Sequence, residues 1–425
     1  MTVHSRPILA SGMAAFAALW LAGYGASAQT PPRQTPEVAA DAGVDPDFAA
    51  AAAADAEAKA PVPGAAPIDT VQPIAIPMAS LNPSLSIILD VGAAWYGAAD
   101  HLTQGGHAID DNGIALQGCE LAASASVDPY FRFDMNFQLT EAELEEVYLT
   151  TLALPLNLQI RAGLMNAAFG RENAMHLHVW SFSNPPLSHT RFMGEEHMRG
   201  PGVELSALLP LPWYLNLIGQ AFATTESLGF ESGTFGSSEQ TGAGRINGLE
   251  DFLYVLRMEN FFELSANWSL LIGFSEGLGQ SPYEPDGRTY LHGGDLYLKW
   301  RPITKAAGEF ALALTVEYML RDEPATNGRF RDHGGYAQLD ALLTNRWMVG
   351  FRYDTTDLWT GRSPDLETMP AWQRRGAASL TFLPTHFSKL RLQGDFVRDS
   401  VRDELGWAVF LQAEVSAGEH GAHKF

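Results

Sequence analysis

The sequence predicts an all-β fold, a transmembrane antiparallel up-and-down β-barrel of the bacterial outer-membrane type. Two observations predict it: a secretory signal at the N-terminus, and period-two alternation of apolar and polar residues along most of the 425-residue chain. No segment after the signal has the ~20 consecutive apolar residues that a membrane-spanning helix needs. Strands are therefore the elements that we expect to cross the membrane.

The first 28 residues have the three parts of a secretory signal. Arg6 supplies the basic start, residues 8–21 form a short apolar run, and Gly25-Ala26-Ser27-Ala28 is a small-residue cleavage site. A membrane anchor is the alternative, but the run is shorter than the ~20 residues of a spanning helix. We expect a signal peptide over residues 1–28, with cleavage after Ala28.

Residues 29–80 have the composition of a disordered linker. Pro and Ala dominate this segment, as in Thr30-Pro31-Pro32 and Pro61-Val62-Pro63-Gly64. Such a segment lacks the varied apolar side chains that build a core, and it is too short and too simple for a plug domain. The barrel is expected over the remaining residues, 81–425.

Alternation is most regular in residues 130–140, where every step changes between apolar and polar. One face carries Phe131, Phe133, Met135, Phe137 and Leu139, and the other carries Arg132, Asp134, Asn136, Gln138 and Thr140. The pattern returns in residues 84–96, 308–321, 346–354, 388–396 and 407–415. Each stretch is predicted to be a strand with one apolar and one polar face.

A soluble β-sandwich also alternates, but two features favour a membrane barrel. Charges of both signs lie in mid-strand on the polar face, where a watery lumen can hold them and a dry core cannot. Short turns also alternate with longer polar loops, which we place near residues 98–112, 165–201, 223–250, 276–291, 322–333 and 356–373. This spacing predicts about sixteen strands, with fourteen as the alternative.

The expected partners follow from the barrel and from the charge. Outer-membrane lipid would cover the wall, and the barrel-assembly machinery would read the terminal aromatic residue, Phe425. The formal net charge of −22 disfavours nucleic acid. An acidic pore would favour cations and small solutes, although loop solubility explains the charge equally well. The one cysteine, Cys119, excludes an internal disulfide and is expected to be an ordinary wall residue.

The longest loop, residues 165–201, carries the candidate pore-constriction residues. If this loop folds into the barrel, its charged side chains face across the lumen and set selectivity, whereas an external cap would have no such role. These side chains are Arg171, Glu172, Arg191, Glu195, Glu196 and Arg199. A second charged set is expected to brace the wall, and it comprises Arg132, Asp134, Glu143, Glu145, Glu146 and Arg161.

Four histidines of the same loop are candidate metal ligands: His176, His178, His189 and His197. In extended backbone His176 and His178 point the same way and could share a zinc ion, although the loop has no standard zinc spacing and its histidines can be simply polar. No firm cofactor is expected, and zinc is the one candidate. Serines lie near His189, but no nucleophile-elbow sequence surrounds them, so we do not expect an enzyme.

Several stretches together resemble a known group of outer-membrane proteins. They are Asn82-Pro83-Ser84-Leu85-Ser86-Ile87-Ile88-Leu89-Asp90-Val91-Gly92, Val147 to Leu154 with the preceding Glu143-Leu144-Glu145-Glu146, Arg161-Ala162-Gly163, the His176-x-His178-x-Trp180 region, and the ending Gly418 to Phe425 with His420 and His423. Residues 82–425 thereby resemble proteobacterial proteins often labelled zinc-regulated TonB-dependent outer-membrane receptors. The resemblance implies an outer-membrane barrel with a link to zinc supply. TonB-dependent transporters have about 22 strands and a plug, so the expected barrel is porin-like and has no plug.

Two hypotheses for the function follow. The first is a porin-like outer-membrane channel for small hydrophilic solutes or ions, because the predicted inner face is polar and charged. The alternative is a metal-linked, zinc-binding receptor or uptake barrel that uses the histidines of the long loop.

Overall fold

The computed structural model describes most of the chain from residue 83 onwards. The described ranges are 83–97, 108–109, 111–194, 197–225, 230–236, 246–284, 286–302, 310–325, 328–361, 370–401 and 405–418. The signal peptide predicted for residues 1–28, the linker predicted for 29–80 and the terminal Phe425 lie outside them.

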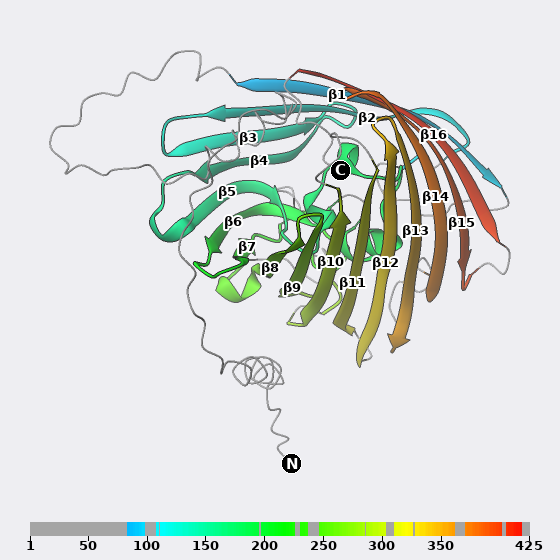
Figure 1. Cartoon of the computed structure of the whole chain (residues 1–425). Coiled ribbons are helices and arrows are strands. Elements are labelled where there is room, and N and C mark those ends of the chain that lie inside the picture. The colour runs from blue at the N-terminus through cyan, green and yellow to red at the C-terminus, as the bar shows by residue number, and fades with distance from the viewer. Residues whose placement is uncertain are drawn as a thin grey trace, which may run out of the picture. The chain divides into compact units, whose positions relative to one another are not determined.

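Sixteen strands form one closed antiparallel barrel (Figure 1). The first eight are β1 Ser84–Gly97, β2 Gly113–Ser126, β3 Phe131–Gln138, β4 Glu143–Thr151, β5 Leu158–Asn166, β6 Arg199–Leu208, β7 Tyr214–Phe222 and β8 Leu253–Ser265. The second eight are β9 Trp268–Gln280, β10 Arg288–Trp300, β11 Ala311–Ala325, β12 Gly328–Thr344, β13 Trp347–Thr360, β14 Trp372–Thr385, β15 Ser388–Asp399 and β16 Gly406–Gly418. The predicted fold class and the count of sixteen strands are confirmed.

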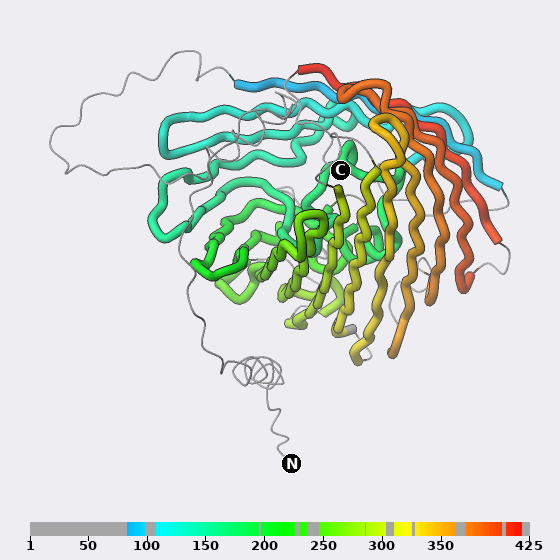
Figure 2. Tube along the Cα trace, viewed as in Figure 1, coloured from blue at the N-terminus to red at the C-terminus, as the bar shows by residue number. Residues whose placement is uncertain are grey.

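Each strand pairs with its neighbours in the sequence, and the first and last strands close the barrel. Figure 2 shows the trace running up and down through neighbouring strands in order. The closing pair of β1 and β16 runs from Ser86 opposite Gly418 to Gly97 opposite Trp407. Closure leaves no sheet edge with unpaired backbone groups, as a bilayer requires. Among the residues that the structure describes, no helix is long and apolar enough to cross a membrane.

The wall is apolar outside and polar inside, as the alternation predicts. On β15, Leu392 and Phe396 are 51% and 58% exposed, whereas Gln393 and Asp395 between them are 1% exposed. A strand sends successive side chains to opposite faces, so the exposed apolar residues form the outer surface. An outer surface of this kind suits lipid rather than water.

Tryptophans lie at both ends of the wall. Trp268 and Trp347 begin β9 and β13, directly after tight turns, while Trp95, Trp359 and Trp407 lie near the opposite rim. All five are exposed. Two aromatic girdles around an apolar band are typical of outer-membrane barrels, so the protein is located in the bacterial outer membrane.

Two of the predicted long loops are wrong. Residues 322–333 mostly belong to strands, because β11 ends only at Ala325 and β12 begins at Gly328. The charged side chains in this region pair across the two strands, as Arg321 does with Asp332. Residues 276–291 contain only a short connection between β9 and β10. Gly277 in this stretch is a strand residue against which the loop residue Phe235 packs, and an added Cβ would lie 3.0 Å from that ring.

Candidate functional site: the inward-folded loop and the wall that it meets

The connection between β5 and β6 lies inside the barrel (Figure 1). It leaves β5 at Asn166 and enters β6 at Arg199. Its three short helices are η3 Glu172–Ala174, η4 Leu177–Val179 and α3 Leu187–Met193. Its side chains meet inward-facing residues of many strands, and these contacts form the candidate site.

An apolar cluster anchors one side of the loop to the wall. Phe169, Phe192 and Met193 of the loop are fully buried. They belong to one cluster with wall and loop residues that include Phe222, Leu253, Val255, Leu291 and Met319. Removal of this apolar surface from water holds the loop against β7–β11.

Gly170 marks the point where the loop backbone passes closest to β11. Its φ is +63°, in the left-handed region, and its N–H donates to the Ser275 hydroxyl at 3.0 Å. A Cβ at this position would come within 1.6 Å of the Glu317 carboxylate. Only glycine fits both the backbone conformation and the close approach.

Cations of β13 and β15 hold the loop by its backbone. Arg352 donates to the Asn184 carbonyl at 3.0 Å, Arg391 to the Trp180 carbonyl at 2.6 Å, and Lys389 to the His178 carbonyl at 2.7 Å. Charged donors make strong hydrogen bonds to carbonyl oxygens, and their long side chains reach into the lumen. The loop backbone is therefore fixed at three points between His178 and Asn184.

Arg191 of α3 fixes the loop to β12. Its guanidinium donates to Asp332 at 2.7 Å, and Asp332 also accepts from Arg321 of β11 at 2.8 Å. All three side chains are buried. Breaking a buried ion pair leaves a charge without compensation, which makes this contact hard to open.

Glu172 places a second carboxyl beside Glu317. The Tyr336 hydroxyl lies 3.2 Å from an oxygen of each carboxyl. Burial raises the pKa of Glu172 to about 7, against the attraction of Arg352 and the hydrogen bond from Tyr336. A group that titrates near neutral pH therefore lies where the loop meets β11 and β12.

The four predicted constriction residues that the structure describes make contacts at separate places on the wall. Arg171 lies over the Tyr297 ring at 4.0 Å, Glu172 meets β11 and β12, and Arg191 meets Asp332. Arg199 lies on β6 and pairs with Glu231 at 3.0 Å and with Glu143. Glu195 and Glu196 lie outside the described residues. Sequence reasoning missed Asp332 as the wall partner of Arg191, because its only local signal was an acidic residue in a stretch that resembled a loop.

The charged set expected to brace the wall is divided between several places. Arg161 pairs with Glu204 at 3.0 Å on the neighbouring strand β6, and Arg132 pairs with Asp134 at 2.7 Å near the tight-turn rim. Glu143 pairs with Arg199. Glu145 and Glu146 instead turn toward the loop.

A register shift explains how adjacent residues Glu145 and Glu146 both face inward. β3 and β4 pair Asn136 with Glu146 and Phe137 with Leu144, so Glu145 is the extra residue of a β-bulge. A bulge interrupts the strict alternation of side chains. Both carboxyls are buried, as is Glu120 of β2.

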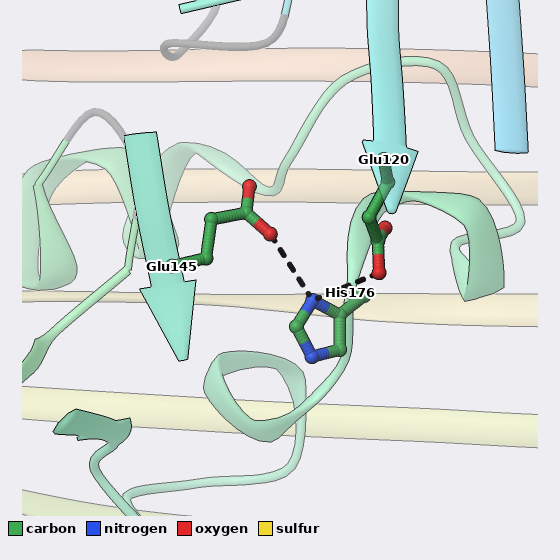
Figure 3. A group of neighbouring side chains, drawn as sticks. All are labelled: Glu120, Glu145 and His176. Atoms are coloured by element: carbon green, nitrogen blue, oxygen red, sulfur yellow. Dashed lines mark ion pairs between the residues drawn. The ribbon is translucent and has the colours of Figure 1, made fainter. Parts of the chain in front are cut away.

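His176 lies among these three carboxyls. Its Nε2 is 2.9 Å from Glu146, and its Nδ1 is 3.6 Å from Glu145 and 4.0 Å from Glu120. Figure 3 shows Glu145 and Glu120 approaching the ring from their two strands. Burial disfavours the charged imidazole, but Glu120, Glu145 and Glu146 outweigh it and raise the pKa of His176 well above its ordinary value.

The other candidate histidines have different neighbours. His178 stacks on His176 with ring centres 5.9 Å apart, and its Nδ1 lies 3.1 Å from Glu120. His197 bonds the Met175 carbonyl at 3.0 Å, and the rings of His189 and His197 are 5.3 Å apart. Within the described ranges, Glu120, Glu145 and His176 form the one group whose ligand atoms converge, within 4.8 Å of one another. Sequence reasoning missed Glu120, whose only signal is a carboxylate on an otherwise small and apolar strand.

Comparisons with known proteins support the fold and identify one relative. No family model matches the chain. An uncharacterized protein of Aquifex aeolicus is 30% identical over 366 residues, covering 79% of this chain and 75% of that protein.

Solved porin-type barrels are similar in structure. The outer-membrane channel DcaP of Acinetobacter baumannii matches with a TM-score of 0.54 at 11% identity, covering 80% of this chain and 98% of that one. An anion-selective porin from Comamonas acidovorans matches with a TM-score of 0.52 at 9% identity, covering 79% and 99%. At these identities the likeness establishes a porin-type fold. The zinc-regulated, TonB-dependent label implied by the sequence resemblance stays a prediction.

Proposed function

Because the chain belongs to the same family as this Aquifex aeolicus protein and folds as a porin-type outer-membrane barrel, we propose that it is a channel for small hydrophilic solutes or ions. The observation that carries the proposal is the loop between β5 and β6, which divides the lumen. The size and charge of what passes would be set by this loop.

The loop reaches strands on opposite sides of the barrel. His176 contacts Glu146 of β4, and Arg191 contacts Asp332 of β12. In a closed barrel of sixteen strands, β4 and β12 are half the circumference apart. A segment that crosses the lumen narrows any passage, which supports a selective channel over a wide, general one.

Buried charges of both signs hold the loop on its two sides. Arg352, Lys389 and Arg391 lie on the β13–β15 side, while Glu120, Glu145 and Glu146 lie on the β2–β4 side. The inner face of the wall is therefore charged and polar on both sides of the loop, which supports hydrophilic solutes over apolar ones.

Ion current through single barrels tests the proposal. The purified protein in a planar lipid bilayer is expected to give stepwise conductance, with bilayers that received only detergent as the control. Absence of steps above that background would reject a channel.

Selectivity tests the role of the loop. Arg171 lies in the loop against Tyr297, whereas Arg132 lies on β3 near the tight-turn rim and is half-exposed. Arg171→Gln is expected to shift the reversal potential in a salt gradient toward cations, because it removes a positive charge beside the passage. The matched control, Arg132→Gln, is expected to leave the reversal potential unchanged. Equal shifts in both variants would contradict a selective role for the loop.

The metal-linked receptor remains a second hypothesis. One observation favours a metal in this barrel: the convergence of Glu120 and Glu145 on His176. Uptake of that metal needs a separate demonstration of transport, and the binding site itself is argued next.

A further inference from the structure

The distances from His176 Nδ1 to the oxygens of Glu145 and Glu120 are too long for hydrogen bonds, but they suit two ligands of a shared metal ion. Nδ1 of His176 lies 3.6 Å from Glu145 Oε2 and 4.0 Å from Glu120 Oε1. A strong N–H···O hydrogen bond is about 2.7–3.2 Å long. With metal–ligand bonds of about 2.1 Å, the ligand atoms of a tetrahedral ion stand ~3.4 Å apart. The 3.6 Å separation is close to this value, and Glu120 would have to move toward Nδ1 by about half an ångström to coordinate the same ion.

Neighbouring groups orient the imidazole for this role. Glu146 Oε2 lies 2.9 Å from His176 Nε2 and holds the proton there, and a metal ion would take the place of the proton on Nδ1, which faces Glu145 and Glu120. The amide nitrogen of Asn136, Nδ2, lies 2.8 Å from the same ring nitrogen and also fixes the position of the ring. A carboxylate behind a histidine is the usual support of a metal-binding imidazole.

Glu120 is oriented in the same way. His178 Nδ1 lies 3.1 Å from Glu120 Oε2, and the other oxygen of this carboxyl, Oε1, faces His176. Each of two ligands therefore has a partner that holds it from behind.

There is room for an ion at this place. A cavity of about 20 Å³ is lined by residues that include Asp90, Glu120, Glu145, His176 and His178. A cavity that holds one water molecule has a volume of roughly 10–15 Å³, and a metal ion is no larger than a water molecule. Glu120, Glu145 and Glu146 are each at most 9% exposed. Several buried carboxylates close together are costly unless positive charge compensates them.

We propose that Glu120, Glu145 and His176 bind one divalent first-row transition-metal ion of the Zn²⁺ or Mn²⁺ class. One imidazole with two carboxylates suits such an ion better than Mg²⁺, which prefers oxygen ligands and retains its waters. The three ligands come from the loop, β2 and β4, so the ion joins the loop to the wall across the lumen from Asp332. This site is distinct from conduction and stands whether or not the barrel passes solutes.

Titration calorimetry tests the site directly. Zn²⁺ is added to the full-length, chelator-treated protein in detergent, and one ion per barrel is expected to bind. His176→Gln and Glu145→Gln are each expected to weaken binding at least ten-fold, since each removes a ligand. His178→Gln is expected to weaken it about ten-fold by releasing Glu120. Circular dichroism checks that each variant keeps its strands.

His292 supplies the matched control. It pairs with the single carboxylate of Glu276 at 2.5 Å on the exposed side of the wall. His292→Gln is expected to leave the affinity unchanged. The proposal is overturned if wild type binds no stoichiometric ion, if the ligand variants bind like wild type, or if His292→Gln loses as much affinity as they do.

A second measurement does not depend on the folding of any variant. Co²⁺ added to wild-type protein is expected to give visible ligand-field absorption that Zn²⁺ abolishes by displacement. Absence of such bands would also overturn the site. Neither measurement uses conductance, so the failure of this proposal and the failure of the channel proposal are distinguishable.

Discussion

Among single residues, Glu172 makes one contact of the loop with the wall sensitive to pH. Its carboxyl is buried between β11 and β12, and its pKa is raised to about 7. The charged or titratable groups around it are Arg171, Glu317, Tyr336, Asp340 and Arg352. The neutral form is the one that this environment stabilises.

The sign of the pH effect follows from this shift. Because the pKa of Glu172 is higher in the folded state than in the unfolded state, its contribution to the free energy of unfolding is complete below about pH 4.5. That contribution is lost as the pH rises through about 7, where the buried carboxyl becomes charged. Glu172→Gln mimics the neutral form. It is expected to match wild type in acid and to exceed it above neutral pH by on the order of 3 kcal/mol in the free energy of unfolding.

Urea unfolding in lipid vesicles at several pH values measures this difference. Glu263→Gln at the exposed end of β8 is the control, because its side chain is solvated in the folded and unfolded states. A constant difference between Glu172→Gln and wild type across the pH range would contradict the prediction.

Among elements, the loop depends on its close passage along the wall at Gly170. Gly170→Ala combines a strained φ with a collision against Glu317. We expect a cost of about 1–3 kcal/mol, which the loop can avoid by leaving the wall. The variant should therefore show faster proteolysis of the loop and a larger single-channel conductance than wild type.

Gly236 provides the control for this change. A Cβ at Gly236 would have no heavy atom within 4 Å. Gly236→Ala is expected to resemble wild type in both measurements. If Gly170→Ala also behaves like wild type, the loop is not held at this point.

For the barrel as a whole, the prediction concerns the lipid-facing wall. Leu392 is near the middle of β15 and faces outward. Leu392→Arg is expected to cost about 2–4 kcal/mol of the free energy of unfolding in vesicles, because a charge then lies in the hydrocarbon layer. Leu154→Arg in the turn after β4 should cost about 1 kcal/mol or less, since it lies at the interface. Equal costs would show that Leu392 does not face the bilayer core.

The wall was predictable because its signal is local. Period-two alternation depends only on neighbouring residues and on the two faces of a strand, so stretches such as 388–396 were recognised. The same local rule failed at residues 322–333. Charged residues there resembled a loop until Arg321 and Asp332 were seen to pair across β11 and β12.

The site itself was predictable only as a list of residue types. The long loop, its charges and His176 and His178 were evident in the sequence, but their partners were not. Arg191 and Asp332 are 141 residues apart, and His178 and Glu120 are 58 apart. No local pattern connects residues at such separations.

The sequence by itself therefore determined a barrel with an apolar outside and a charged inside, of about sixteen strands with fourteen as the alternative, and the structure has sixteen. Only the tertiary structure decided that the loop crosses the lumen and that Glu120 and Glu145 converge on His176. The physical reason is that alternation follows from the geometry of each strand. Convergence depends on barrel closure, on register and on the β-bulge at Glu145, which together bring distant side chains to one place.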